Sequence, residues 1–589
     1  MAMFTPNRRP PRFESPGEPR VSVTPCKRKW GFSPEEKQHP HGPVRIQEFM
    51  SWPTDVIASI AAWDSDALGN LVGVLRRGLA VNSDYSGMDC PREVLTQCFE
   101  AVARFKSIDK NEFRLTFRRA SDKGQLQKKV LTRIATANDG SCVMGDILER
   151  LPKSARKYIA AAAPAKNDPR EKKTKANQHI LEWLQQNRGY CFLVDARSPC
   201  CVHGAQCMVF QDRTSPTEGR RHPIRMSVAG VTCVGWSAEG QREEFAHESE
   251  IPHAVWMTER FQAECNNLED CFFAECTVRY PVERLAEHLP NHTIISIIDG
   301  PEKHGWPSKR HRVLIFGWSN ARLRWAGPHT SREEITKDYS RKFHRTTVRA
   351  GDVFMAASAE DVMKEYIELA KVQTYQLTEQ DFNVIGSMEL LSMVLPPGAV
   401  QRFHAWQKHL SEKDPDPDAE YIVDVEHHCR SRGASSGSQW PVQLTHGLIM
   451  KIPASGDGWR LATPMEHLAA HGWHVFDHTL PGDYSVTKQK EILEGLSSHS
   501  LKTLNGNSMH LRTQGAWMMY CLSYLHVKPN VFDVNDEWDE LYEETESQVT
   551  CSETTRSPSI LRVPEKAWRS SLAPRAEDAK DVVVVADPE

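Results

Sequence analysis

The sequence lacks the features that mark membrane, secreted and repeat proteins. It has no run of eighteen or more apolar residues, which argues against a membrane-spanning helix. The first residues contain no apolar core, so we do not expect a secretory signal. The fifteen cysteines lack the short regular spacings of a disulfide framework, which predicts reduced thiols in an intracellular protein. No internal repeat is visible.

An excess of charge of one sign is also absent. The 73 lysines and arginines nearly balance the 77 acidic residues, for a net charge of −4. This value averages a basic N-terminal segment with an acidic C-terminal one, so it neither supports nor excludes a nucleic-acid partner. A hydrophobic content of 40% and a charged content of 25% are ordinary for a soluble protein. The length of 589 residues predicts two to four domains.

The composition changes several times along the chain. We expect a main domain in two parts, interrupted by a region with few ordered signals. The predicted segments are a disordered basic tail rich in proline (1–44), a helical lead-in (45–78), the first part of the main domain (79–329, with an insertion at about 151–225), the interrupting region (330–455), the second part (456–530) and an acidic disordered tail (531–589).

Strand and helix signals alternate in the main domain. Residues 79–87 read as a strand that ends in a glycine turn, and residues 91–105 follow with apolar residues at helical spacing. Further strands are predicted at 111–120, 291–299 and 309–318. The alternation predicts an α/β fold with a mostly parallel, Rossmann-like sheet. A strand, glycine turn and helix in succession are the usual cradle for an adenosyl or nucleotide group.

Cys233 lies in a turn of small residues, and related motifs precede and follow it. The motifs are, in chain order, NSDYSGMD (82–89), AGVTCVGWSAEG (229–240), AECT (274–277), HGWPSKRHRVLIFGW (304–318), WRLATPMEHLAAHGWHVFD (459–477) and LNGNSM (504–509). This series resembles the C5-cytosine DNA methyltransferase family over roughly residues 78–525. The resemblance implies a class I methyltransferase domain, with residues 330–455 as a smaller, irregular target-recognition region. It also implies S-adenosyl-L-methionine as cofactor and double-stranded DNA, with the cytosine flipped out, as partner.

The resemblance assigns chemical roles to four residues. Cys233 is the expected nucleophile, because a thiolate that adds to C6 of cytosine makes C5 reactive enough to accept a methyl group. A protonated Glu275 would hydrogen-bond N3 of the base and assist that addition. Arg310 and Arg312, two residues apart on a predicted strand, should face the same side and hold the cytosine carbonyl, a phosphate or Glu275. For Cys233 and Glu275, a purely structural role is the alternative.

Cofactor contacts are also implied by the resemblance. Tyr85 would pack on adenine, and the Asp122 carboxylate would accept hydrogen bonds from the ribose hydroxyls. Taken alone, Asp122 could equally be a helix N-cap. The complete expected set is Tyr85, Ser86, Gly87, Met88, Asp122, Asp146, Ile147, Asn507 and Ser508.

The sequence departs from the family pattern at several positions. They are Ser83, Asp89, Val231, Thr232, Val234 and Cys276. These departures support an alternative, a catalytically inactive protein that binds nucleic acid. Retention of Cys233, Glu275 and Arg312 favours the enzyme. A cytosine-5 RNA methyltransferase is a further alternative, but the Cys-Phe-Thr of that branch does not follow residues 460–477.

Three shorter motifs complete the predictions. Thr463, Pro464 and Glu466 have the order of a helix N-cap and first turn. Lys27 to Lys29 could direct the protein to the nucleus, where we expect it, or could belong to a solvated tail. Residues 200–207 contain Cys200, Cys201, His203 and Cys207, but lack the paired spacing typical of zinc ligands. We therefore predict no metal site, with zinc as the less favoured alternative.

Overall fold

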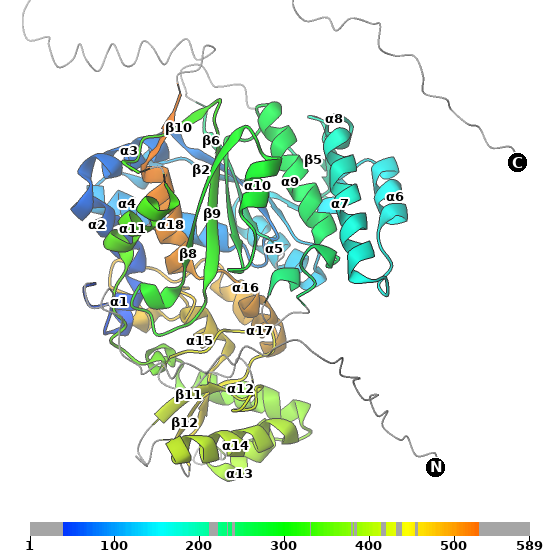
Figure 1. The fold of residues 1–589 in the computed structure, drawn as a ribbon. Helices are drawn as coiled ribbons and strands as arrows, with labels where there is room; N and C mark the ends of the chain where they lie inside the picture. Colours follow the sequence, from blue (N-terminus) through cyan, green and yellow to red (C-terminus); the bar gives the residue numbers. More distant parts are fainter. Residues whose placement is uncertain are drawn as a thin grey trace, which may run out of the picture. The chain divides into compact units, whose positions relative to one another are not determined.

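The computed structural model describes residues 39–210, 222–231, 234–237, 242–329, 331–378, 381, 386–413, 420–431, 439–453 and 457–528. A seven-stranded sheet in the order β3-β2-β1-β6-β7-β9-β8 forms the centre of this part of the chain (Figure 1). Its strands are β1 (Leu79–Asp84), β2 (Leu115–Ser121), β3 (Cys142–Met144), β6 (Ile224–Gly230), β7 (Cys271–Cys276), β8 (His292–Asp299) and β9 (Arg312–Ser319). Strand β9 runs antiparallel to β7 and β8, and all other pairings in this sheet are parallel. The predicted α/β class with a mostly parallel, Rossmann-like sheet is confirmed.

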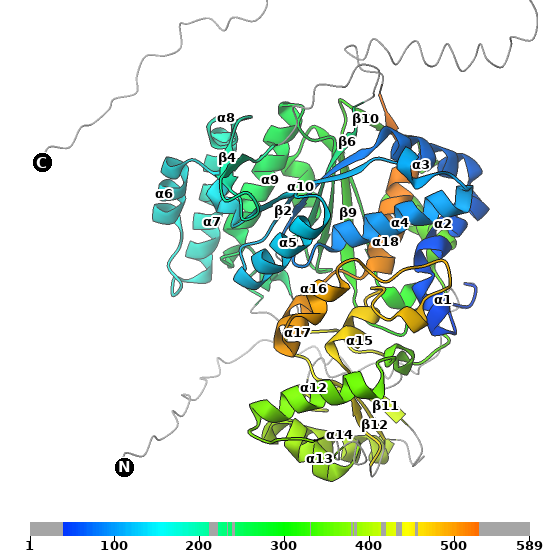
Figure 2. The ribbon, with the colours of Figure 1, turned by 180° about the vertical axis from the view of Figure 1, so that it is seen from behind.

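Both faces of the sheet are apolar, and the alternation of side chains along a strand explains this. In β7, Cys271 and Phe273 belong to one hydrophobic cluster, whereas Phe272 and Ala274 belong to another. Strands buried on both faces are typical of parallel sheets that helices cover on each side. Helices on one side of the sheet share the first cluster: α2 (Trp52–Trp63), α3 (Ser65–Arg77), α4 (Cys90–Lys106), α11 (Arg332–Phe343) and α18 (Leu511–Ser523) (Figure 1). Helices on the other side share the second: α7 (Arg170–Gln186), α9 (Glu250–Cys265) and α10 (Glu283–His288) (Figure 2).

The predicted elements of the main domain are largely confirmed. Helix α4 and strands β8 and β9 match the predicted ranges closely. Strand β2 begins four residues later than predicted, because residues 110–112 form a 3₁₀ turn capped by Asp109. Helix α5 (Gln125–Asn138) packs beside β2 and β3, and α1 (Ile46–Met50) precedes α2.

The region at 330–455 contains more order than its sequence indicates. Helix α11 packs into the main core through Ile335, Tyr339 and Phe343, which recur every four residues. A separate core follows from residue 359 to residue 461. It is built from α12 (Ala359–Val372), α13 (Met388–Val394), α14 (Pro397–Lys413) and an antiparallel sheet of β11 (Glu420–Asp424), β12 (Ile449–Pro453) and β13 (Arg460–Leu461).

Within the predicted insertion, the described residues 151–210 contain helices and a hairpin. Ile180, Leu181 and Leu184 of α7 are buried against α9. The other elements of the insertion are α6 (Lys153–Ala162), α8 (Arg188–Cys191) and the antiparallel strands β4 (Arg197–Pro199) and β5 (Gln206–Met208).

The helix start predicted at Thr463 is confirmed. The Thr463 hydroxyl accepts from the Glu466 amide, and the Glu466 carboxylate accepts from the Thr463 amide, which is a capping box at the start of α15 (Pro464–Ala469). Glu466 also accepts from the Ala357 amide, so the cap joins two distant segments. Further elements are α16 (Lys490–Glu494), α17 (Ser498–Gly506) and the strand pair β10 (Leu323–Trp325) and β14 (Leu525–Val527).

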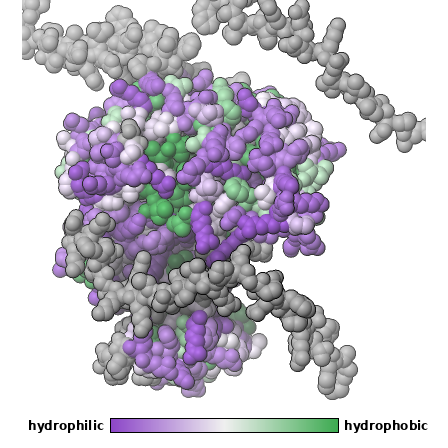
Figure 3. Space-filling view, viewed as in Figure 1, coloured by the Kyte–Doolittle hydropathy of each residue, from purple (hydrophilic) through white to green (hydrophobic). Residues whose placement is uncertain are grey.

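Among the described residues, no helix combines the length and the apolar character that crossing a membrane requires. The molecular surface is mainly hydrophilic in the view of Figure 3, with a limited hydrophobic area near its centre.

A network of six buried charged side chains lies under the ends of β1 and β2. Arg119 and Arg150 both reach the Asp84 carboxylate, the former at 3.2 Å. Arg150 also pairs with Glu259 at 2.7 Å. Burial alone would raise the pKa of Asp84, but the neighbouring guanidinium groups outweigh it and hold that pKa far below its usual range. The members are Asp84, Arg119, Arg150, Glu259, Arg260 and Glu269.

Removing one charge from this network should destabilise the fold. We expect Asp84→Asn to lower the free energy of unfolding by about 3 kcal/mol, because it leaves three buried arginines with only two carboxylates, Glu259 and Glu269. Urea unfolding measures the change. The matched control is Glu112→Gln, which breaks the exposed pair of Glu112 with Arg76 and should cost less than about 1 kcal/mol. Equal effects of the two substitutions would contradict a structural role for the network.

Candidate active site

The carboxyl ends of the parallel strands lie at the same end of the sheet, and the antiparallel β9 begins at that end. The strand order reverses between β1 and β6, and ligands of open α/β sheets bind at such a switch point. The predicted site residues within the described chain lie at the strand ends on this side of the sheet, in the loops next to those ends, or in the segment at 507–508.

The loop after β1 makes a tight turn with three left-handed residues. Tyr85, Gly87 and Asp89 have φ angles of 53°, 58° and 63°. A Cβ atom on Gly87 would meet no atom within 4 Å, so the turn leaves open space at that point. Asp89 stands where the family pattern has a second glycine. Aspartate is among the residues that tolerate the left-handed region, so the turn keeps its conformation with Asp89 at this position.

Ser86 and Asp122 join the ends of β1 and β2. The Ser86 amide donates to the Ser121 carbonyl at 3.0 Å, and the Ser121 amide donates to the Ser86 hydroxyl at 2.9 Å. The Asp122 carboxylate accepts from the amides of Gly87 at 3.1 Å and Gly124 at 2.9 Å. The N-cap of α5 is Gly124, so the reading of Asp122 as a helix N-cap is wrong. Burial raises the pKa of Asp122.

The segment after β3 lies beside this turn. Asp146 caps a short 3₁₀ helix by accepting from the Leu148 amide at 3.0 Å. Ile147 is buried in the hydrophobic cluster against which Tyr85 packs. The Tyr85 hydroxyl is buried and has no hydrogen-bond partner among the described residues. Met88 instead packs into the core on the opposite face, so only its backbone is available to a ligand.

The segment at 507–509 returns to the same place. The Ser508 hydroxyl lies 3.2 Å from the Cys90 thiol at the start of α4. A Cβ atom on Gly230, at the end of β6, would lie 3.3 Å from Met509. Asn507 is exposed, and its side-chain amide donates to the Thr503 carbonyl of its own helix at 3.2 Å. Ser508 is therefore at the expected position, while Asn507 points its amide back to α17.

Two arginines converge on Glu275 at the end of β7. The Glu275 Oε1 atom lies 3.4 Å from Nε of Arg312 and 3.7 Å from Nε of Arg310. Both arginines face the side of β9 on which Leu314 is buried, as their spacing predicts. Arg310 also lies 3.4 Å from the Gly506 carbonyl, so it connects Glu275 to the 504–509 segment.

A cavity of about 10 Å³ lies beside this group and has room for about one water molecule. Helix α18 contributes a wall that sequence reasoning missed, formed by Thr513 and Gln514 together with the preceding His510. Both side-chain amide atoms of Gln514 are buried without a partner among the described residues. Burial lowers the pKa of His510 well below its usual range, so this imidazole is neutral. His510, Thr513 and Gln514 follow shortly after Gly506-Asn507-Ser508, and this position is the feature of the sequence that could have indicated their place in the site.

Cys233 and Thr232 lie outside the described residues, but the residues before and after them are placed. The Val231 amide donates to the Glu275 carbonyl at 3.1 Å. Trp236 is buried and donates from its indole to Glu250 at 3.1 Å. A Cβ on Gly235 would lie 2.7 Å from Cβ of His247, so only glycine fits there. The chain is therefore held in place on both sides of Cys233. Before it, Val231 bonds to the Glu275 backbone, and after it, Trp236 bonds to Glu250.

Comparisons with known proteins give weak matches. No family model and no curated protein matches the sequence. Solved structures that match include a DNMT2 mutant from Spodoptera frugiperda (10% identity, TM-score 0.31, 75% of this chain and 99% of that chain). The EhMeth methyltransferase of Entamoeba histolytica matches at 10% identity and a TM-score of 0.33, over 75% of this chain and 98% of that chain. A prophage-encoded DNA modification methyltransferase described as putative, from E. coli, matches at 12% and 0.31, over 76% and 97%. Similarity at this level assigns no activity.

The left-handed conformation of Asp89 gives a testable prediction. We expect Asp89→Ala to be about 1 kcal/mol less stable than Asp89→Gly, because both lose the pair with Arg92 but only alanine is strained at positive φ. Chemical denaturation measures the difference. Asp361 lies within helix α12, so there the alanine variant should be at least as stable as the glycine variant. An Asp89→Ala variant as stable as Asp89→Gly would show that the turn does not need this conformation.

Proposed function

We propose that this protein is an S-adenosyl-L-methionine-dependent DNA (cytosine-5)-methyltransferase. The observation that carries the proposal is the meeting of two groups at the switch point of the sheet. One is the turn at 85–89, of the kind that cradles an adenosyl group. The other is Glu275 with its two arginines. The segment that carries Cys233 begins beside Glu275, because the Val231 amide donates to the Glu275 carbonyl. This pairing supports a transfer reaction better than simple binding.

The residues around the turn fit an adenosyl cofactor. Gly87 leaves space where a side chain would project, and the unpaired Tyr85 hydroxyl is buried nearby. A carboxylate offers about four acceptor positions, so Asp122 can hold the turn and still accept from ribose hydroxyls. Tyr85 and Ile147 would hold the adenine ring. S-adenosyl-L-methionine, when bound, supplies an electrophilic methyl group.

The chain's own residues would activate the cytosine. The Cys233 thiolate adds to C6, so that an S–C6 bond forms and C5 becomes nucleophilic. A protonated Glu275 donates to N3 and stabilises the charge that develops on the ring. Arg310 and Arg312 orient Glu275 and would hold the base carbonyl or a phosphate. After C5 has gained the methyl group it loses its proton, and the S–C6 bond breaks to regenerate the thiolate.

DNA is the preferred substrate class in this proposal. A base inside a duplex cannot reach the site, so the cytosine would be flipped out, and the small cavity must widen to admit it. The unit at 359–461 would read the neighbouring nucleotides. It is coupled to the arginine segment, because the Trp440 amide donates to Pro307 at 2.6 Å and the Lys309 amide donates to Trp440 at 3.2 Å. Nuclear localisation rests only on Lys27 to Lys29, which lie outside the described residues.

Tritiated methyl transfer tests the proposal directly. Unmethylated duplex DNA, hemimethylated duplex DNA and transfer RNA are offered to the wild type, to Cys233→Ala and to Cys265→Ala, a control at an exposed cysteine. We expect transfer to DNA that is lost in Cys233→Ala and kept in the control. Transfer to RNA alone would favour the RNA methyltransferase. Absence of both transfer and cofactor binding in folded protein would favour the inactive nucleic-acid-binding protein.

Glu275→Gln separates activation of the base from binding. The variant keeps the size of the side chain but cannot act as a general acid, so we expect kcat to fall by about 10²- to 10⁴-fold. Affinity for S-adenosyl-L-methionine, measured by calorimetry, should change less than about threefold, because Glu275 lies outside the cofactor turn. A large loss of cofactor affinity with unchanged kcat would contradict the assigned role.

A further inference from the structure

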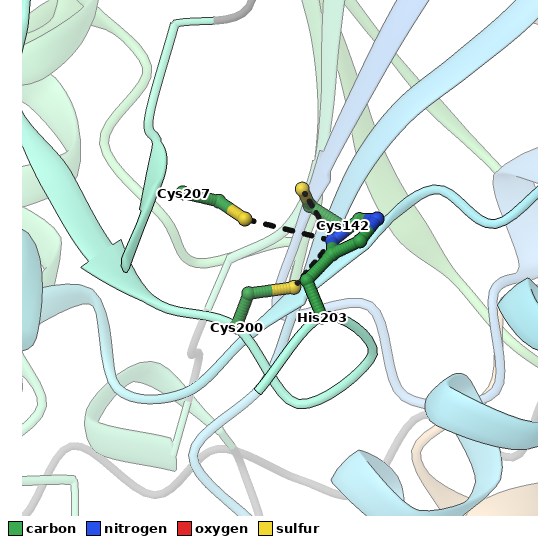
Figure 4. A group of neighbouring side chains, drawn as sticks. All are labelled: Cys142, Cys200, His203 and Cys207. Carbon is green, nitrogen blue, oxygen red and sulfur yellow. Dashed lines mark hydrogen bonds between the residues drawn. The ribbon is translucent and has the colours of Figure 1, made fainter. Parts of the chain in front are cut away.

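Four side chains from two distant segments converge at the edge of the sheet next to β3. They are Cys142, Cys200, His203 and Cys207, and their ligand atoms all lie within 4.8 Å of one another (Figure 4). None of the three cysteines forms a disulfide. The sequence motif covers only residues 200–207, and β3 adds a third thiol, that of Cys142, to the two at the ends of the hairpin turn.

The distances match a metal tetrahedron. The His203 Nδ1 atom lies 3.2 Å from the sulfur of Cys200 and 3.5 Å from the sulfurs of Cys142 and Cys207. With Zn–S of about 2.3 Å and Zn–N of about 2.0–2.1 Å, ideal tetrahedral angles place nitrogen and sulfur about 3.5 Å apart. Sulfur pairs would lie about 3.8 Å apart, which is within the observed limit. The four atoms thus surround a space of the right size for one ion.

The backbone holds this arrangement in place. Cys142 begins β3, and the other three residues belong to the β4–β5 hairpin and its turn, where Gly204 has a φ of 61°. The Cys201 amide donates to the Val143 carbonyl at 2.7 Å, and Met144 forms a β-bridge with Cys200. Cys201 contributes this backbone hydrogen bond, but its side chain is exposed, so it does not belong to the group of four ligand residues.

We propose that Cys142, Cys200, His203 and Cys207 bind one structural Zn²⁺ ion. Three thiolates and one imidazole are a common ligand set of structural zinc, and four protein ligands leave no open position for catalysis. The soft sulfur ligands select against magnesium and calcium, which prefer oxygen. Cys142 and Cys200 are buried among Met144, Val209 and Phe210, and this apolar wall limits access of water to the ion. The proposal does not depend on the proposed enzymatic activity.

Metal analysis of the full-length protein, purified under reducing conditions without chelators, tests this site. We expect about one zinc per chain in the wild type and in Cys201→Ser, the matched control one residue from a ligand. Cys142→Ser and Cys207→Ser should retain less than about a tenth of that. Zinc that is absent from wild-type protein even after incubation with Zn²⁺ would overturn the proposal, as would equal loss in Cys201→Ser.

Cobalt substitution covers the case in which a cysteine variant fails to fold. Wild-type protein is treated with a chelator under reducing conditions and titrated with Co²⁺. We expect visible d–d bands of tetrahedral Co²⁺ that saturate at one equivalent and are displaced by Zn²⁺, with the same result for Cys201→Ser. Spectra of octahedral Co²⁺ or the absence of saturation would overturn the assignment without any ligand variant.

Discussion

Guanidinium groups reach Asp84, the last residue of β1, from β2, from the turn after β3 and from α9. Removing six charged side chains from water is costly, and only simultaneous pairing offsets that cost. The elements that carry the charges must therefore assemble together and in one geometry. Asp84 directly precedes the left-handed turn at 85–89. The position of that turn relative to β2 and β3 follows from the network below it.

Local chemistry explains several departures from the family pattern. Asp89 keeps a left-handed backbone that glycine would otherwise supply, and it adds a pair with Arg92. Cys276 is buried in the core on the face opposite Glu275, where a small apolar side chain suits the packing. Trp236, in place of phenylalanine, has an indole that bonds to Glu250. Each of these residues therefore has a structural role of its own in the described part of the chain.

Local patterns predicted the local structure well. The capping box at Thr463 and Glu466 was readable because all its groups lie within four residues. The common face of Arg310 and Arg312 followed from strand periodicity. The partners that complete each site could not be read in this way, since they come from distant segments: Gln514 joins Glu275 across more than two hundred residues, and Cys142 joins a hairpin near residue 200. Helix α11 was missed because its polar surroundings hide a narrow apolar stripe.

The hairpin at 197–208 lies against β3, one of the two edge strands of the seven, where an open sheet presents unpaired amides and carbonyls. Exposed edges of this kind recruit strands from other molecules. Here the Val143 carbonyl is already occupied by the chain's own Cys201 amide, and the β-bridge at Met144 occupies the next position. The hairpin thus occupies backbone groups of β3 with which a strand of another molecule could pair. If the hairpin detached, we expect the protein to be prone to aggregation through the edge of β3.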